Sequence, residues 1–370
     1  MNKMVINHLE KLFVTSDAHT IIQESDIHHP AAKMVAQAAK MQENEAGDNT
    51  NLLLIIVGEL MLQAATLINM GLHPSEIVIG YEKAAKRTHK LLGELVCHKL
   101  ESPRDHKMVQ TAIKSVIASK QFGLEDHLSN LITKACLHAM PRDEKRFNVD
   151  NIRVQKILGG SQMDSEVVQG ILVVRGSETE IRRVEKAKIA VFSTNIEMQQ
   201  GETKGTVLLT NADDLLGYTR GEEDKFELFI KSMAEAGISC IVCQGSMSEL
   251  AIHFMQKYGM MGLKIMSKWE LKRIARAVGA TPSVKLVCPS PEECGYADEV
   301  AFKEISSRWC TIFRRDQEEN KMATIILRGS TIAMLEDCER AIDNGVNCVK
   351  SLIKDPRLLP GAGATEMMIA

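Results

Sequence analysis

Hydrophobic and polar positions follow two different periods along the chain, and the change falls near residue 150. Before it, apolar residues recur every three or four positions, which is typical of helices with one buried face. After it, short runs rich in β-branched residues alternate with helical stretches, which indicates a layered α/β region. From Thr331 to about Ile353 the pattern returns to one long helix. The order helical, α/β, helical predicts a domain that is interrupted in sequence by a second one.

The predicted strands of the α/β region are short apolar runs. Helical patterns at 222–236, 246–258 and 268–278 separate several of them. Pro282, Pro289 and Pro291 make 281–296 a loop or an edge segment, because proline cannot donate to a strand ladder. The strand-like runs are 152–158, 167–174, 187–192, 206–210, 238–243, 263–266 and 323–329.

Capping residues and prolines place the helices of the first part. A strand-like stretch at 12–15 precedes Asp17, which is expected to cap a helix that runs to about residue 26. Pro30 and Pro74 each open a further helix, because proline suits the first helical turn. Two more helical patterns follow at about 104–117 and 124–139.

The segment 52–72 is apolar on nearly every side and long enough to cross a membrane. Glu59 lies inside it, and a charge near the bilayer centre costs a few kcal/mol. A helix of this kind is equally typical of the core of a large soluble protein. We therefore expect a buried core helix and no membrane partner.

Composition excludes several classes of protein. A length of 370 residues predicts two or three domains, and 45% hydrophobic with 25% charged residues excludes wholesale disorder. The net charge of −3 and the aromatic content of 4% argue against a nucleic-acid partner, since both a positive field and stacking platforms are missing. Nine scattered cysteines are expected to be reduced thiols of a cytoplasmic protein, and the first residues do not form a signal peptide.

The loop 45–51, EAGDNTN, joins a polar turn to the start of the apolar helix. Helix N-termini bind phosphate through unpaired N–H groups and the helix dipole. Asp48 could hold a Mg²⁺ ion that bridges phosphates, and Thr50 offers a hydroxyl to the same group. The same residues in the same order are also typical of a simple helix cap. Both interpretations remain open at this point.

Three further motifs give weaker signals. The glycine turn 360–364, PGAGA, precedes a helix start, and glycine pairs are also common helix ends. Cys240 and Cys243 form a CxxC in an apolar run and are expected to be buried core thiols. The helix 268–278 has an apolar face and a basic face, which favours either simple packing or a surface for apolar or acidic segments. Its candidate client-binding residues are Lys268, Leu271, Lys272 and Arg276.

Both ends of the pattern look unfinished. The last residues, 365–370, begin an apolar helix that stops after about one turn, which is too short to be stable alone. The helical segment 1–140 is apolar enough to need partners. From this pattern we expect a chain that is truncated at both ends or is a fragment.

Several segments in order along the whole chain resemble the group II chaperonins. Three of them, 147–158, 267–273 and 357–366, indicate one subunit type within that family. Ordered matches over the full length are more specific than any single motif. The segments are MNKMVINHLEKLFVTSDA (1–18), HPAAKMV (29–35), GDNTN (47–51), SKQFG (119–123), FNVDNIRVQKILGG (147–160), TKGTVLL (203–209), SKWELKRIARAVGAT (267–281), TIILRGST (324–331) and DPRLLPGAGATE (355–366).

The resemblance implies a multidomain fold of α and α/β parts. A helical equatorial domain would comprise 1–96 and resume at 361–370. A small intermediate domain would be built from 97–162 and 325–360. An α/β apical domain that binds clients would lie between them at 163–324, with a lid-forming protrusion around 194–230.

The resemblance also implies roles for single residues. ATP and Mg²⁺ are the family's cofactors, and the family's metal-binding carboxylates match Asp17 and Asp48. The family's second loop glycine is Asn49 here, and its water-activating Asp falls on Asn344, beside Asp343. The family's phosphate loop would precede Met1. The nucleotide-binding positions are Gly47, Asp48, Asn49, Thr50, Asn51, Gly361 and Gly363.

The function implied is that of a cytoplasmic chaperonin subunit that binds unfolded proteins such as actin and tubulin. It would act with the other subunits of a double ring that closes by hydrolysing ATP. The alternative is a truncated, ATPase-defective holdase or a non-functional fragment. Whether this chain is an enzyme stays open, because the site departs from the family pattern at Asn49 and Asn344. A free-standing hydrolase or oxidoreductase is disfavoured, since its motifs are missing from the sequence.

Overall fold

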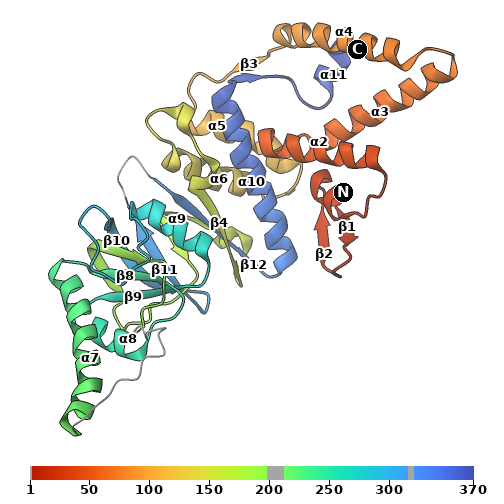
Figure 1. Cartoon of the computed structure of the whole chain (residues 1–370). Helices are drawn as coiled ribbons and strands as arrows, with labels where there is room; N and C mark the ends of the chain where they lie inside the picture. The colour runs from red at the N-terminus through yellow and green to blue at the C-terminus, as the bar shows by residue number, and fades with distance from the viewer. Residues whose placement is uncertain (1, 198–211, 316–320) are drawn as a thin grey trace. The chain divides into compact units, whose positions relative to one another are not determined.

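The computed structural model describes residues 2–197, 212–315 and 321–370, and it contains two compact units. The first unit combines residues 1–166 with 327–370, and the second comprises 167–326 (Figure 1). The interruption of a mainly helical part by an α/β part agrees with the hydrophobic pattern, and the expected fold class is confirmed. The predicted strand 206–210 and part of the expected protrusion, residues 198–211, lie outside the described residues.

The first unit is mainly helical. Two small antiparallel pairs, β1 with β2 and β3 with β13, accompany the helices. The helices are α1 (Ala18–Glu24), α2 (Pro30–Ala46), α3 (Thr50–Asn69), α4 (Pro74–Glu94), α5 (His106–Ala118), α6 (Glu125–Ala139), α10 (Ile332–Lys354) and α11 (Ala364–Ile369). The paired strands are β1 (Lys3–Ile6), β2 (Leu12–Thr15), β3 (His98–Lys99) and β13 (Arg357–Leu358), and short 3₁₀ turns lie at Glu144–Arg146, Val149–Asn151 and Gln162–Asp164.

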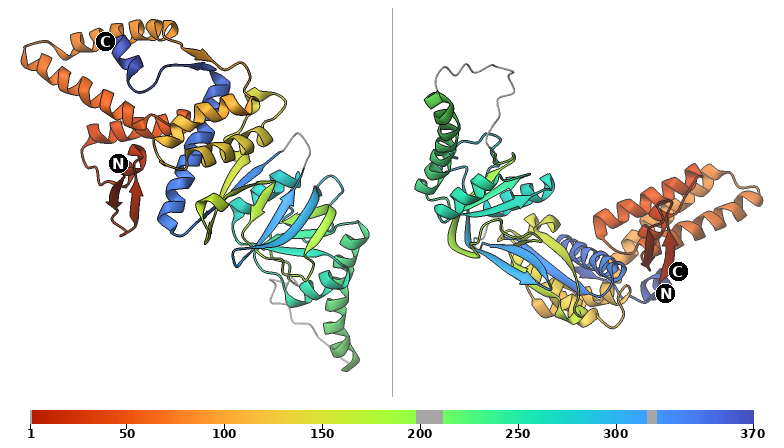
Figure 2. Two further views of the ribbon diagram at one scale, coloured as in Figure 1. Left: turned by 180° about the vertical axis from the view of Figure 1, so that it is seen from behind. Right: turned by 90° about the horizontal axis from the view of Figure 1, so that it is seen from below.

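Helix α10 is the central element of this unit. It packs against α2, α5 and α6, as the views from two sides show (Figures 1 and 2). Gly345 makes this packing close, because a Cβ there would lie 2.8 Å from Ile132 and 3.3 Å from Ile117. The predicted starts of the helices are confirmed: Asp17 caps α1 by accepting a hydrogen bond from the Thr20 N–H, and Pro30 opens α2.

Helix α3 does not have the buried position that its composition predicts. It is long and apolar enough to cross a membrane, but none of its most apolar stretch is buried in this chain. Ile55 and Leu62 are each 63% exposed, and only Thr50 of the helix is buried. The expectation of a core helix was therefore wrong for this chain. An apolar sequence indicates that a helix favours burial, but it does not show which part of the chain, or which partner, would bury it.

The second unit is built on a six-stranded mixed sheet. Strands β6, β11, β10 and β7 are antiparallel neighbours, and β7, β8 and β9 are parallel neighbours. The strands are β6 (Ile171–Val173), β7 (Arg183–Phe192), β8 (Cys240–Gln244), β9 (Met261–Ile265), β10 (Gly295–Ile305) and β11 (Arg308–Arg314). A separate three-stranded sheet has the order β4 (Ile152–Leu158), β12 (Ala323–Gly329), β5 (Glu166–Gln169).

Helices cover both faces of the six-stranded sheet. Helix α9 (Lys268–Val278) packs into one apolar cluster, while α7 (Ala212–Glu235) and α8 (Glu249–Lys257) pack into the other. Cys240 belongs to the first cluster and Cys243 to the second, because residues three apart on a strand point to opposite faces. Burial raises the pKa of both thiols to about 12. The CxxC is therefore a pair of core thiols, as expected.

Candidate nucleotide site

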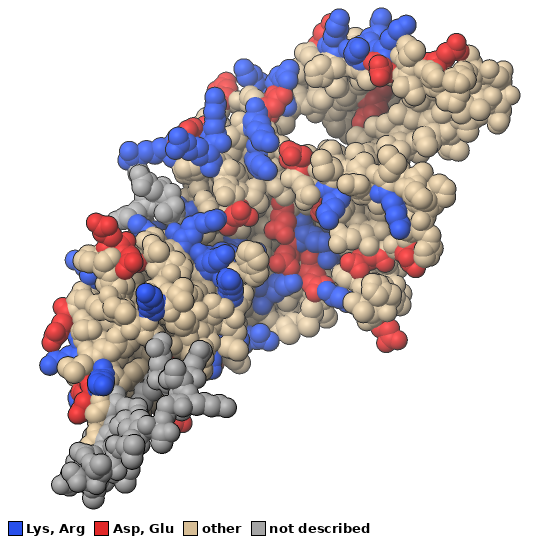
Figure 3. Space-filling view, viewed as in Figure 1, with Lys and Arg blue, Asp and Glu red and all other residues tan. Residues whose placement is uncertain are grey.

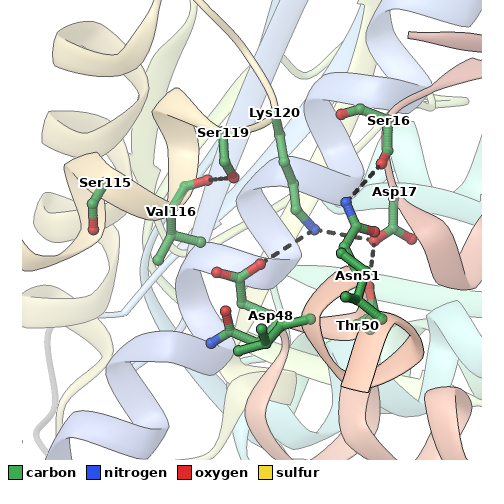
Figure 4. A pocket seen from close by; sticks show the side chains of 12 residues that line it. Ser16, Asp17, Asp48, Thr50, Asn51, Ser115, Val116, Ser119 and Lys120 are labelled. Carbon is green, nitrogen blue, oxygen red and sulfur yellow. Dashed lines mark hydrogen bonds and ion pairs between the residues drawn. The ribbon is translucent and has the colours of Figure 1, made fainter. Parts of the chain in front are cut away.

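A cavity of about 470 Å³ lies in the first unit where three chain segments meet (Figure 4). The segments are the turn after β2, the loop from α2 into α3, and the end of α5. The lining residues are Ser16, Asp17, Asp48, Asn49, Thr50, Asn51, Leu52, Ile55, Ser115, Val116, Ser119 and Lys120. Five of the residues proposed from the sequence therefore share one cavity, although Asp17 is separated from the others by the whole of α2.

Asp17 is the most enclosed acidic group of the cavity, with 3% of the residue exposed. Its Oδ2 accepts hydrogen bonds from the Thr20 N–H at 3.1 Å and the Thr20 hydroxyl at 2.9 Å. Its Oδ1 accepts from the Thr50 hydroxyl at 3.3 Å and from Lys120 at 3.2 Å. Burial alone would raise the pKa of Asp17, but Lys120 and the hydrogen bonds from Thr20 outweigh it and lower the pKa. Asp17 is therefore held as a carboxylate.

Lys120 is the charged residue of the cavity that the residue patterns did not predict. Its Nζ lies 3.2 Å from Oδ1 of Asp17 and 3.9 Å from Oδ1 of Asp48, and its side chain is only 10% exposed. It lies two residues after the end of α5, so no spacing within the sequence connects it with the loop 47–51. The only signal was its place in the segment SKQFG, which contributed to the family resemblance.

The loop before α3 has the backbone of a glycine turn. Gly47 ends α2 with φ +76°, and a Cβ at this position would lie 2.3 Å from Cβ of Asn347. Asn49 has φ 64°, a left-handed conformation that glycine adopts freely and that asparagine tolerates better than most residues. The replacement of glycine by Asn49 thus keeps the loop conformation and adds a side chain to the cavity wall.

The donors around the cavity fit a magnesium nucleotide. Carboxylate and hydroxyl oxygens of Asp17, Asp48 and Thr50 are the hard ligands that Mg²⁺ prefers. Asn49 makes no side-chain capping bond, so its side chain leaves the first N–H groups of α3 open to a ligand. A helix N-terminus with a neighbouring lysine is a favourable place for phosphate. The side chain of Asn51 connects the start of α3 to the start of α1, since its Oδ1 accepts a hydrogen bond from the Ala18 N–H at 3.0 Å.

The other residues proposed from the sequence do not line this cavity. Asn344 lies on α10 with 2% exposed, and its Nδ2 has no hydrogen-bond partner among the described residues. Its carbonyl oxygen would be 3.1 Å from a Cβ at Gly47, so α10 supports the loop from behind. Gly361 and Gly363 lie in the turn before α11 and have no atoms near enough to contact an added Cβ. No group of three or more His, Cys, Asp or Glu forms a metal cluster in the described ranges.

Asp343, next to Asn344 on α10, is a carboxyl group whose pKa is raised in the folded state. Although part of its side chain reaches solvent, desolvation of the carboxyl group by the protein around it, and then the charge of Glu339, raise the pKa of Asp343 to about 6. Asp343 is ionised above pH 6 in the folded and the unfolded state, and the folded state is then less stable because it disfavours the carboxylate. We expect Asp343→Asn to raise the free energy of unfolding at pH 7.5 by about 1 kcal/mol or less, because solvent screens the exposed part.

The gain in the free energy of unfolding from Asp343→Asn should shrink as the pH falls from 6 to 4. It should vanish below pH 4, where the aspartate is protonated in the folded and the unfolded state. Urea unfolding across this pH range measures it, with Asp150→Asn, at an exposed residue, as the control. A gain that stays constant down to pH 3 would contradict this account of Asp343.

The basic face of α9 lies in the second unit. Lys268, Lys272 and Arg276 are exposed, and Nζ of Lys272 lies 5.4 Å from the ring centre of Trp269, which is 70% exposed. Leu271 is only 1% exposed and packs in the core. The expectation that Leu271 contacts clients was therefore wrong for the described fold, because it lies on the inner face of the helix.

Comparison with known proteins supports one family. The TCP-1/cpn60 chaperonin family model matches residues 1–370. The chain is 50% identical over 367 residues to T-complex protein 1 subunit theta of Dictyostelium discoideum, which covers 99% of this chain and 68% of that protein. It is 46% identical over 372 residues to the subunit of the same name from Arabidopsis thaliana, an alignment that covers 100% of this chain and 68% of that protein. For the Mus musculus subunit theta the identity is 44% over 370 residues, and the alignment covers 100% of this chain and 67% of that protein.

Theta is thus the subunit type that the three segments 147–158, 267–273 and 357–366 indicate, and the resemblance found in the sequence is confirmed. The family match extends from the first to the last residue, so it includes the cavity residues of the first unit and the α/β fold of the second. The chain belongs to the TCP-1/cpn60 chaperonin family.

Proposed function

We propose that the chain is a chaperonin subunit that binds a magnesium nucleotide in the cavity of its first unit and unfolded proteins on its second. It works in the cytosol with the other subunits of a hetero-oligomeric ring. The observation that carries the proposal is the convergence of Asp17, Asp48, Thr50 and Lys120 on one cavity in a chain of this family. An α/β chain unrelated to this family would have no reason to bring these groups together.

Each cavity residue has a defined task in this proposal. Asp17 and Asp48 hold Mg²⁺, which when bound neutralises phosphate charge. Lys120, released from the carboxylates, pairs with a phosphate as a point charge, and the first N–H groups of α3 donate to the same group. The Thr50 hydroxyl holds Oδ1 of Asp17 in position. The three-domain division, with equatorial 1–96 and 361–370, intermediate 97–162 and 325–360, and apical 163–324, remains part of the proposal.

A second candidate is a client-binding subunit that does not turn over ATP. The observation in its favour is Asn344, because an amide cannot accept a proton from water as a carboxylate does. In this case the nucleotide would act only as a ligand that stabilises one conformation. Both candidates bind a nucleotide and clients, and the second adds that this chain hydrolyses no ATP.

Assembly with the other ring subunits tests the subunit function. We expect the tagged chain, co-expressed with them, to elute from size exclusion at the size of the ring when Mg²⁺ and ATP are present. The Asp48→Ala variant should assemble less well, because its nucleotide is bound weakly. Elution of the unchanged chain only as a free monomer under all conditions would contradict the subunit function, which both candidates share.

Charge reversal on α9 tests the client surface. Lys272→Glu and Arg276→Glu should each weaken capture of acidic unfolded segments by about three- to tenfold at low salt, since exposed charges act through screened attraction. The melting curve should hardly change, because both side chains are exposed. Lys303→Glu, on the exposed part of β10, is the matched control. Capture that stays equal in all three variants would remove α9 from the client surface.

A further inference from the structure

A second cavity, of about 380 Å³, lies at the C-terminal end of α10 in the first unit. One wall is the turn from Glu144 to Phe147, and the other is formed by the last two turns of the helix. Lining residues are Glu144, Lys145, Phe147, Lys350, Ile353 and Lys354. None of them lines the nucleotide cavity or belongs to the proposed nucleotide site.

The cavity carries positive charge that the described part of the chain does not neutralise. Lys145 and Lys350 have no ion-pair partner among the described residues. Lys354 has only a long pair with Glu45 at 3.8 Å, and both side chains are mostly exposed. Lys350 and Lys354 are also neighbours on one helix face, where like charges four residues apart destabilise by about 0.2–0.5 kcal/mol. The negative end of the α10 dipole offsets part of this charge, but it equals only about half an elementary charge.

The acidic residues next to the cavity are already paired with arginines. Glu144 is held by Arg104 at 3.0 Å, and Asp143 by Arg146 at 3.2 Å. Asp355, just beyond the helix, lies 2.7 Å from Arg357. These carboxylates are therefore not free to compensate the three lysines. Figure 3 shows Lys and Arg side chains gathered on this part of the first unit, on a chain whose net charge is −3.

The chemistry of the cavity favours carboxylates over phosphate. Planar, bidentate binding of phosphate is the strength of arginine, and Arg104 here is occupied by Glu144 and by the Pro141 carbonyl at 2.7 Å. The available cations are three separate lysine ammonium groups. Phe147 and Ile353 add an apolar part to the wall, which suits an aliphatic side chain between the charges. An acidic segment with one apolar residue matches both features.

We propose that this cavity is a docking site for an acidic segment of a partner protein, with its carboxylates on Lys145, Lys350 and Lys354 and an apolar side chain against Phe147 and Ile353. The site is independent of the proposed nucleotide cavity and of the α9 surface. The failure of either of those two assignments would therefore leave this proposal unaffected.

The test uses the full chain without nucleotide and a short fluorescein-labelled peptide with a central Leu between Asp and Glu residues. Fluorescence anisotropy at low salt measures its binding. We expect Lys145→Glu with Lys350→Glu to weaken binding at least about tenfold, and a peptide with Asn and Gln in place of Asp and Glu not to bind. A peptide with Lys in place of the acidic residues should bind the double variant better than the unchanged chain.

Two controls separate binding in this cavity from binding elsewhere on the chain. Lys40→Glu, at an exposed position of α2, should leave binding unchanged, and Lys272→Glu with Arg276→Glu measures any peptide taken up by α9. Lys350→Gln repeats the test with a milder change in case the double variant folds poorly. The proposal is overturned if the Lys145 and Lys350 variants bind like the unchanged chain, if the neutral peptide binds equally well, or if tripolyphosphate binds there more tightly than the peptide.

Discussion

Single-turnover ATP hydrolysis by the purified chain is expected to be indistinguishable from that of its Asp48→Ala variant. The residue at the family's water-activating position is Asn344, and the loss of one general base typically costs about 10²–10⁴ in rate. Asn344→Asp alone should not restore turnover, because residue 344 does not line the cavity and its side chain is buried on α10. Rapid-quench measurement of phosphate release with enzyme in excess gives the rate directly.

The Asp48→Ala variant sets the background, because it removes a proposed metal ligand. Turnover clearly above that background would show that another carboxylate activates water. Asp343 is the first candidate, since it is adjacent and its pKa of about 6 suits a base near neutral pH. In that case Asp343→Asn would abolish the turnover, and our inference that Asn344 leaves the chain without a general base would be wrong.

Gly47→Ala is expected to have the largest effect on both stability and nucleotide binding. The new Cβ would lie 2.3 Å from Cβ of Asn347 on α10, a distance that real contacts do not reach, so the loop or the helix must move. The residue also needs φ +76°, which costs about 1–2 kcal/mol for a side chain. Overpacking adds about 1–3 kcal/mol. We expect the free energy of unfolding to fall by about 2–5 kcal/mol and Mg²⁺–ATP binding to be lost.

Gly71→Ala is the matched control. Gly71 also has a positive φ, +99°, but nothing lies within 4 Å of its added Cβ, so it carries the backbone strain without the contact. Urea unfolding and calorimetric titration with Mg²⁺–ATP compare the two variants. If Gly47→Ala were no more destabilising than Gly71→Ala, the loop would not depend on its close contact with α10.

Much of the fold follows from local signals in the sequence. Asp17, Pro30 and Pro74 start helices where capping rules place them, and the runs at 152–158 and 323–329 are strands with those bounds. These predictions depend on a few neighbouring residues, so no knowledge of the tertiary structure is needed. The CxxC was also assigned correctly, because its apolar surroundings are a property of the sequence.

The long hairpin of β10 and β11 was not predicted. Its turn is Ser306–Ser307, with φ 49° and 62°, where hairpins usually show Asn-Gly or Asp-Gly. Charged residues such as Glu299, Lys303 and Glu304 further dilute the strand pattern. The turn therefore carried no sequence signal, and the strand pairing that stabilises it is a long-range property of the sheet.

The candidate site was predicted only in part. Asp48 and Thr50 were proposed from the residues of their own loop, and Asp17 through the family resemblance. Lys120 was found from the structure, since it meets them only after α5 packs beside the loop. The exposure of α3 is a similar case, because burial depends on which surfaces are brought together. Local chemistry can be deduced from the sequence, but the convergence of distant segments cannot.

The central claim is that Asp17, Asp48 and Lys120 form one magnesium–nucleotide site. Isothermal titration of the purified chain with ATP, with and without Mg²⁺, tests it most directly. The account predicts binding that requires Mg²⁺ and that falls at least about tenfold in Asp48→Asn and in Lys120→Met, with Lys40→Glu unchanged, since charge-assisted contacts are worth about 1.5–3 kcal/mol each. Binding that is equal without Mg²⁺, or equal in all these variants, would contradict the account.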